Sequence, residues 1–295
     1  LTHGEIKDKN TSGNVSTYGT LTYDSYSSSD CLPANGGCFH GVHVAGIAAA
    51  DYNGNSATSV LDDTGYTWSS TSYPLLDYGM VGVAYNSALH LSDYTGTSGG
   101  SQASYWALAT DSARSAGAVA QNNSWGYNAN LNYTIDTFLN YQSNNNSTDG
   151  DTYAAVGGDS SASWDDYANA LNSFQSGGVV VRSSGNDTSD TEVDGLAGMP
   201  LIYTDLAEAW LTVGNLVVNG GDATSSTVTR LGNQCGLAAK FCIFADGYQI
   251  TSGIGNYNGS MYYSYSSSSM SAPIVSGGVA LLSEAFPNHT PAQIV

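Results

Sequence analysis

Basic residues are scarce in this sequence, and their scarcity excludes one group of partners. The 295 residues include 6 lysines and arginines against 25 aspartates and glutamates, which gives a formal charge of −19 at pH 7. The phosphates of nucleic acids and anionic membrane surfaces would repel such a chain. We therefore expect no nucleic-acid partner, and we interpret the charge as a contribution to solubility in an extracellular medium.

Long apolar runs are also missing. A membrane-spanning helix needs a run of roughly 18 or more apolar residues, and the sequence contains none, nor does it contain a signal peptide. A chain of this length can bury a full-sized core, so we expect one domain over residues 1–295, without membrane insertion. The first residue is Leu1 rather than Met, and Val295 interrupts an amphipathic run. We therefore expect that the domain is cut at both ends.

The sequence has four cysteines, in two pairs of equal spacing: Cys31 with Cys38, and Cys235 with Cys242. Four cysteines permit three connectivities, and pairing within each polar, glycine-bearing loop is favoured because such a loop can bring its two thiols together. These disulfides would indicate an oxidising, extracytoplasmic compartment. The alternative is a zinc site, whose four ligands would be Cys31, Cys38, His40 and His43.

Helical patterns alternate with short apolar runs along the chain, which is typical of an α/β fold whose parallel sheet is covered on both faces. We predict helices that begin at His40, that span 102–116, and that begin with Ser163 as the cap. Their inward faces are predicted to be Val44, Ile47 and Ala48, then Tyr105, Leu108, Ala109 and Ala113, then Trp164, Tyr167, Leu171 and Phe174. We expect strands at residues 18–23, 88–92, 118–125, 179–181, 210–218 and 240–244.

Three short segments together could perform acyl transfer, which needs a nucleophile, a base and donors for an oxyanion. His40 opens a helix of small residues in HGVHVAG. Ser269 stands in SSMSAP, just before another helix, whose N-terminus would favour negative charge on its hydroxyl. Asn186 ends the apolar strand VVVRSSGN, where its carboxamide could face a substrate oxygen. Each segment alone also has a structural interpretation as a core histidine, a cap or a turn.

Over nearly the whole chain, these segments in this order resemble the subtilase family of serine peptidases, in which Asp, His and Ser follow one another. The resemblance implies a secreted endopeptidase with a three-layer α/β fold, in which helices flank a mainly parallel central sheet. It implies that His40 is the general base, that Ser269 is the nucleophile of an acyl-enzyme, and that Asn186 is the oxyanion-hole asparagine. The expected substrates are polypeptides, and we expect a monomer.

The resemblance also assigns the substrate-binding residues. The segment that would line the peptide is Asn123, Ser124, Trp125 and Gly126, with Gly185 beside it. The residues 82–84 match a turn that precedes a core strand. We expect the floor of the pocket for the P1 side chain, the residue before the cleaved bond, in the segment 195–205.

The chain departs from the family pattern in several places. Residues 1–6 resemble the segment that follows the triad aspartate, so we expect that aspartate ahead of Leu1 and not in this chain; Asp24 is the best internal candidate. Ser267 and Ser268 replace the usual Gly and Thr before the nucleophile, Val42 replaces a Thr, and Phe39 replaces a small residue. Of these, Ser267 matters most, because a serine is less suited than glycine to a tight turn. Arg182 is unusual beside the asparagine, and we expect it to face solvent.

These departures keep two other functions open. The first is a catalytically weak or inactive binding or processing module with the same fold. The second is a surface or adhesion protein, which the Ser/Tyr/Asn-rich composition favours but which leaves the ordered motifs unexplained.

Metal binding and location are further expectations. The chemistry needs no cofactor, but hard oxygen donors at alternating positions make calcium a candidate at Asp51, Asn53 and Asn55, and the run 187–194 is similar. Residues 232–247, with their cysteine pair ahead of the serine motif, resemble the autotransporter-type subgroup of Gram-negative bacteria. We therefore expect a secreted protein or one at the bacterial cell surface.

Overall fold

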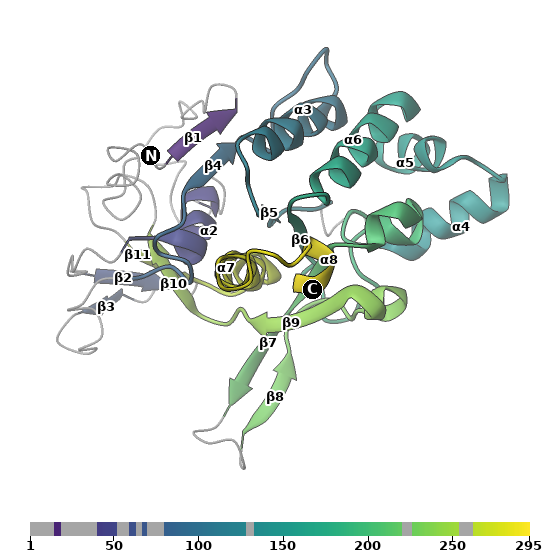
Figure 1. Ribbon diagram of the computed structural model, residues 1–295. Coiled ribbons are helices and arrows are strands. Elements are labelled where there is room, and N and C mark those ends of the chain that lie inside the picture. Colours follow the sequence, from purple (N-terminus) through teal and green to yellow (C-terminus); the bar gives the residue numbers. More distant parts are fainter. Residues whose placement is uncertain are drawn as a thin grey trace.

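A central sheet of five strands organises the protein (Figure 1). The computed structural model describes residues 15–18, 40–51, 59–62, 67–69, 80–127, 133–219, 226–253 and 262–295. The strand order is β5-β6-β7-β8, and β9 also pairs with β7. All pairs are parallel except β7 with β8, which form a hairpin that projects from the sheet (Figure 1). The strands are β5 (Ala120–Asn123), β6 (Val179–Ser183), β7 (Trp210–Asn219), β8 (Thr227–Arg230) and β9 (Cys242–Asp246).

Helices cover both faces of this sheet. On one face, α7 lies against β5, β6, β7 and β9, with α2 packed beside it and α8 at its end. On the other face lies a group of four helices, of which α6 contacts β6 and packs along α3 (Figure 1). The helices on the first face are α2 (His40–Ala49), α7 (Ser268–Ala285) and α8 (Pro291–Ile294). The helices on the second face are α3 (Gln102–Ser115), α4 (Ile135–Asn145), α5 (Asp149–Gly157) and α6 (Ser161–Phe174). The expected three-layer α/β arrangement is therefore present.

The strand β6 shows why both layers form. Successive side chains of a strand point to opposite faces. Val179 and Val181 belong to the apolar cluster that includes α7, whereas Val180 belongs to the cluster of the opposite helices. All five residues of β6 are buried. A strand enclosed on both faces needs an apolar run rather than an alternating pattern, as predicted for residues 179–181.

Two smaller sheets contain the remaining described strands. β1 (Val15–Tyr18) pairs in parallel with β4 (Leu89–Ser92). Four further strands follow the order β10-β11-β2-β3, and β10 packs against α2. They are β2 (Ser59–Asp62), β3 (Thr67–Ser69), β10 (Ile250–Gly253) and β11 (Tyr262–Tyr265). Short 3₁₀ helices occur at η4 (Met199–Leu201), η5 (Thr204–Ala207) and η6 (Gly236–Phe241). Within the described ranges, no helix has the length and apolarity that crossing a membrane requires.

The helix α6 confirms the predicted apolar face but begins earlier than expected. Its predicted inward residues are all buried: Trp164, Tyr167, Leu171 and Phe174. The cap is Ser160, whose hydroxyl accepts a hydrogen bond from the backbone N–H of Ser163 (3.2 Å). The prediction of Ser163 as the cap is wrong because several serines precede this helix, and the cap position is decided by the packing of the whole helix.

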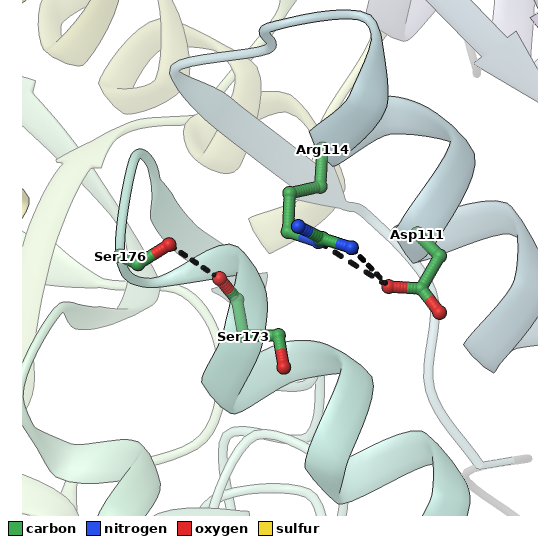
Figure 2. A network of polar contacts seen from close by, with 4 residues as sticks. All are labelled: Asp111, Arg114, Ser173 and Ser176. Atoms are coloured by element: carbon green, nitrogen blue, oxygen red, sulfur yellow. Dashed lines mark hydrogen bonds and ion pairs between the residues drawn. The ribbon is translucent and has the colours of Figure 1, made fainter.

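The helix α3 confirms the predicted inward face only in part: Ala109 is buried and Ala113 packs against the core, as predicted. Leu108 is 45% exposed, whereas Ala103 and Ala107 are buried. Small side chains allow α3 to pack along α6, so here size rather than hydrophobicity selects the contact face. Figure 2 shows the carboxyl-terminal ends of these helices, where Arg114 pairs with Asp111 (3.3 Å) on the surface of α3. An exposed pair of this kind contributes little to stability.

The predicted strand boundaries are confirmed to within a few residues where the structure describes them. The strand predicted at 88–92 is β4, and the one at 210–218 is β7. The strand predicted at 240–244 starts two residues later, because η6 continues through Phe241. The strand predicted at 18–23 overlaps β1 at Tyr18, and the remainder lies outside the described residues.

One predicted disulfide is confirmed. Cys235 and Cys242 are bonded, with Cα atoms 6.0 Å apart, at the two ends of η6. Closing so short a loop restricts the unfolded chain and stabilises the fold by roughly 2.5 kcal/mol. Cys31 and Cys38 lie outside the described residues, so their pairing stays a prediction.

His43 is a buried histidine in α2 whose protonation is linked to folding. Its side chain is 0% exposed, and Nε2 donates to the carbonyl oxygen of Tyr263 (2.8 Å). Burial lowers its pKa from 6.5 to about 4, because desolvation disfavours the imidazolium and outweighs the hydrogen bond. Between these two values the unfolded chain binds more protons than the folded one. His43 therefore contributes stability that is present above pH 6.5 and is lost as the pH falls towards 4.

We predict that His43→Gln reduces the acid sensitivity of the fold. Urea unfolding at pH 7 and pH 4.5 should show a loss of stability in the original chain that is about 2–3 kcal/mol larger than in the variant. The matched control is His289→Gln, since His289 is exposed. Equal pH dependence in the original chain and in His43→Gln would contradict the assignment.

Candidate functional site

A cavity of about 170 Å³ lies where the chain leaves the carboxyl ends of β5 and β6. It brings together residues of three predicted segments: Ser269, Gly185 with Asn186, and Trp125 with Gly126. The complete lining is Trp125, Gly126, Tyr127, Tyr133, Thr134, Ser183, Gly185, Asn186, Asp187, Asp190, Asp194, Asn233 and Ser269. Segments about 60 to 140 residues apart therefore share one surface.

Ser269 lies in the first turn of α7 and is 8% exposed. Its hydroxyl donates to the carbonyl oxygen of Ser124 (3.2 Å), and the Ser124 hydroxyl donates to the carbonyl oxygen of Ser269 (2.8 Å). This reciprocal pair attaches the start of α7 to the segment that follows β5. The N-terminal end of a helix dipole favours negative charge, so the position suits a serine that must pass through an anionic state.

Asn186 is held by the residue that precedes the candidate nucleophile. Its Oδ1 accepts hydrogen bonds from both the backbone N–H and the hydroxyl of Ser268, each 2.8 Å long. The oxygen of the carboxamide is thereby occupied, which leaves Nδ2 as the group that can donate to a ligand in the cavity. Gly185 has φ of +113°, and a Cβ there would lie 2.5 Å from the Asn233 side chain, so this turn requires glycine.

Ser267 caps α7 in an extended conformation, with φ of −170°. Any residue adopts this conformation, so the expectation that a serine is less suited than glycine here is wrong. The substitution has a different consequence. The Ser267 hydroxyl accepts a hydrogen bond from the backbone N–H of Ser269 (3.1 Å), so this donor beside the candidate nucleophile is already engaged within the helix cap.

His40 starts α2, which packs against α7 through Val44, Ile47 and Met270. Desolvation by burial lowers the pKa of His40 below its usual value. His40 does not line the cavity, and among the described residues neither Ser269 nor a carboxylate makes a hydrogen bond with it. Catalytic hydrogen bonds are often long in ligand-free enzymes and shorten when substrate binds. Asp24 lies outside the described residues.

Arg182 is fully buried, and the expectation that it faces solvent is wrong. Its guanidinium carbon lies 4.3 Å from the centre of the Trp125 ring, and Nη2 donates to the hydroxyl of Tyr167 (2.6 Å). Nη1 donates to the carbonyl oxygen of Trp125 (3.5 Å). The signal for burial was present in the sequence, because Arg182 shares the inward face of Val180 at a spacing of two.

Asp194 is a site residue that the sequence analysis named only as the end of a candidate calcium-binding run. Its Oδ2 accepts from the backbone N–H of Tyr127 and its Oδ1 from that of Leu196, both at 2.9 Å. Burial raises its pKa to about 6, although these hydrogen bonds and the charge of Arg182 act in the opposite direction. Asp194 therefore supports the backbone of the cavity wall and also places a carboxyl group in the lining.

The segment 195–205, in which we expect the floor of the P1 pocket, lies within the described residues. Residues 195–205 do not line this cavity, and Leu196, Met199 and Ile202 are buried in the apolar core instead. Asp190 and Asp194, just ahead of that segment, do line the cavity. The apolar residues turn away from the cavity because they pack beneath the sheet, next to α4 and α6.

Neither metal hypothesis gains support from the described part of the chain. No group of three or more His, Cys, Asp or Glu gathers there that could hold an ion, and this includes the run 187–194. Asn53 and Asn55 lie outside the described residues, so calcium near Asp51 stays a prediction. For the zinc alternative, Nε2 of His43 already donates to a backbone oxygen, and both predicted cysteine ligands lie outside the described residues.

We predict that Arg182→Met destabilises the fold by about 1–3 kcal/mol, because it leaves the buried hydroxyl of Tyr167 and the carbonyl oxygen of Trp125 without their hydrogen-bond donor. Arg114→Met is the matched control. Arg114 is exposed, and its removal should change stability by less than about 1 kcal/mol. Urea unfolding at pH 7.5 measures both. Similar losses for the two variants would show that Arg182 contributes no more than a surface residue.

Comparisons with known structures agree with this architecture. Sphericase is 19% identical, with a TM-score of 0.56, over 99% of this chain and 76% of that one. A cold-adapted subtilisin-like serine proteinase is 21% identical, with a TM-score of 0.52, over 99% and 74%. Fervidolysin from Fervidobacterium pennivorans is 22% identical, with a TM-score of 0.50, over 86% of this chain and 31% of that one. At these identities, the likeness shows the fold. This chain thus spans about a third of the length of fervidolysin.

The sequence comparisons give the family. Among curated proteins, none matches the chain. The sequence profile of the Subtilase family matches residues 9–295, which is almost the full length. This match and the shared α/β fold lead to one conclusion: the chain belongs to the subtilase family of serine peptidases.

Proposed function

We propose that this chain is the peptidase domain of a serine endopeptidase that hydrolyses polypeptides through an acyl-enzyme. One observation carries the proposal: Ser269 and Asn186 line the same cavity, and Ser268 fixes the orientation of the asparagine from the residue next to the nucleophile. A hydroxyl at a helix N-terminus beside an amide donor is the arrangement that acyl transfer requires.

Each residue then has a defined role. Ser269 attacks the carbonyl carbon of the peptide, and His40 accepts its proton and returns it to the leaving amine. Nδ2 of Asn186 and the backbone N–H of Ser269 stabilise the oxyanion. The triad aspartate, which would hold the correct tautomer of His40, is assigned to none of the described residues.

The substrate-binding segment is proposed to be Asn123 to Gly126, with Gly185 opposite. This segment continues from β5, which is an edge strand of the central sheet among the described residues. Trp125 and Gly126 of the segment line the cavity. An extended peptide can pair with such a backbone as an added strand. The Cys235–Cys242 disulfide supports a location outside the cytoplasm, either secreted or at the cell surface.

A binding module without catalysis is the second candidate. Two observations favour it: the N–H of Ser269 is already hydrogen-bonded to Ser267, and within the described residues no hydrogen bond joins His40 to Ser269. The two candidates differ in the reactivity of Ser269.

We predict that a fluorophosphonate probe labels the protein at Ser269 and that Ser269→Ala abolishes the labelling. His40→Ala should slow labelling by roughly 10²–10⁴-fold, because the base no longer takes the hydroxyl proton. Ser271→Ala is the control, since Ser271 lies on the same helix and donates to the carbonyl oxygen of Ala245. Peptide mapping by mass spectrometry identifies the modified residue. Labelling that survives in Ser269→Ala would rule out this nucleophile.

We also predict that Ser267→Gly accelerates labelling. The variant frees the N–H of Ser269 for the oxyanion, and one such competing hydrogen bond is worth roughly a 2- to 10-fold change in rate. Glycine is a tolerable cap, so the helix should lose only a few tenths of a kcal/mol. Ser267→Thr keeps a hydroxyl and serves as the control. If the second-order rate constant of labelling is unchanged in the glycine variant, the Ser267 hydroxyl does not compete for that donor.

A further inference from the structure

The charge of the cavity beside Ser269 is the feature that the proposed function leaves unused. Its lining contains three carboxylates, Asp187, Asp190 and Asp194, and includes no lysine, arginine or histidine. Aspartate and glutamate together occupy 25 of the 295 positions of the chain. Three of them among the 13 lining residues is a concentration in one place.

These carboxylates are held in position by the protein. Asp194 accepts two backbone N–H groups, as described above. Asp190 accepts from Nδ2 of Asn233 (3.2 Å), and Oδ1 of Asn233 accepts from the backbone N–H of Asp187 (2.9 Å). Asn233 therefore organises the acidic rim. The negative charge has a fixed geometry, so it can discriminate among ligands rather than only attract them.

Arg182 does not neutralise this cavity from within. It lies behind Trp125, outside the lining, and its hydrogen bonds go to Trp125 and Tyr167. Among the described residues, no ion pair joins Arg182 to Asp194. The raised pKa of Asp194 agrees with a buried carboxyl group that lacks sufficient positive charge nearby.

Three aromatic residues share the lining with the carboxylates. Trp125, Tyr127 and Tyr133 all line the cavity. Lysine and arginine have a long apolar stem that packs on such surfaces and a cationic head that needs a carboxylate. The combination of aromatic walls with fixed negative charge therefore matches a long basic side chain better than a neutral one.

We propose that this cavity receives the side chain that precedes the cleaved bond and that it selects lysine or arginine, with Asp194 and Asp190 as the specificity-determining residues. The inference rests on the proposed function, because it uses the nearness of the cavity to Ser269 and Asn186 to place the scissile bond. A neutral aromatic side chain is the alternative occupant that the experiment must separate.

The first experiment measures binding without catalysis. Benzamidine, a cationic aromatic compound, is titrated into the full chain by calorimetry at pH 7.5, with neutral benzamide as its matched partner. Benzamidine should bind at least 10-fold more tightly, because a hydrogen bond to a charged group adds about that factor or more. Equal binding of the two compounds would overturn the inference.

Variants locate the charge. Asp194→Asn should reduce benzamidine affinity by about 10-fold, and Asp190→Asn, which is more exposed, by about 2- to 5-fold. Asp166→Asn is the control, because Asp166 is exposed on α6 and lies outside the cavity. Asp194 also supports the backbone, so if Asp194→Asn fails to fold, Asp190→Asn still decides. Unchanged affinity in Asp190→Asn together with unchanged or untestable Asp194→Asn would overturn the assignment of these residues.

The second experiment separates this inference from the proposed function. Peptidyl phosphonates with lysine or phenylalanine next to the phosphorus compete with the fluorophosphonate for Ser269. Faster reaction of the lysine compound, slowed selectively by Asp190→Asn, supports the inference. Faster reaction of the phenylalanine compound overturns it while leaving the nucleophile intact. Absence of any labelling, with benzamidine still preferred, overturns the peptidase mechanism but supports the cationic preference of the cavity.

Discussion

The attachment of the start of α7 to the ends of two strands is the constraint on which the site depends. Ser269 and Ser124 exchange hydrogen bonds between helix and β5 segment, and Ser268 binds Asn186 after β6. Because these contacts involve backbone groups as well as side chains, they fix distances rather than only proximity. The candidate nucleophile, the amide donor and the peptide-binding segment are therefore positioned by one short stretch of helix.

The position of α7 follows from burial on both sides of the sheet. Val179 and Val181 pack against Ala272 and Val279 of the helix, whereas Val180 and Arg182 face the opposite helices. Arg182 then stacks behind Trp125, so the cavity wall is supported from the core. The positive charge of Arg182 stays buried behind Trp125, whereas the carboxyl groups of Asp190 and Asp194 line the cavity. The cavity surface is therefore negative.

Much of the fold could be predicted because local patterns reflect local forces. The apolar run of β6 and the helical spacing of Trp164, Tyr167 and Leu171 each predict directly which side chains are buried. The exposure of Leu108 on α3 could not be predicted in the same way, because close packing against α6 favoured alanines at the contact. The N-cap of α6 at Ser160 could not be predicted either, because it depends on how the whole helix packs on the rest of the protein.

The sequence by itself determined the α/β class, the family motifs around His40, Asn186 and Ser269, and the local disulfide at Cys235, since each depends on residues that are near one another in the chain. Only the tertiary structure decided that Arg182 stacks on Trp125 and that Asp190 and Asp194 line the cavity. The physical reason is that parallel strands joined by helices bring distant segments together at one edge of the sheet, so the charge of that surface is a property of the fold and not of any single segment.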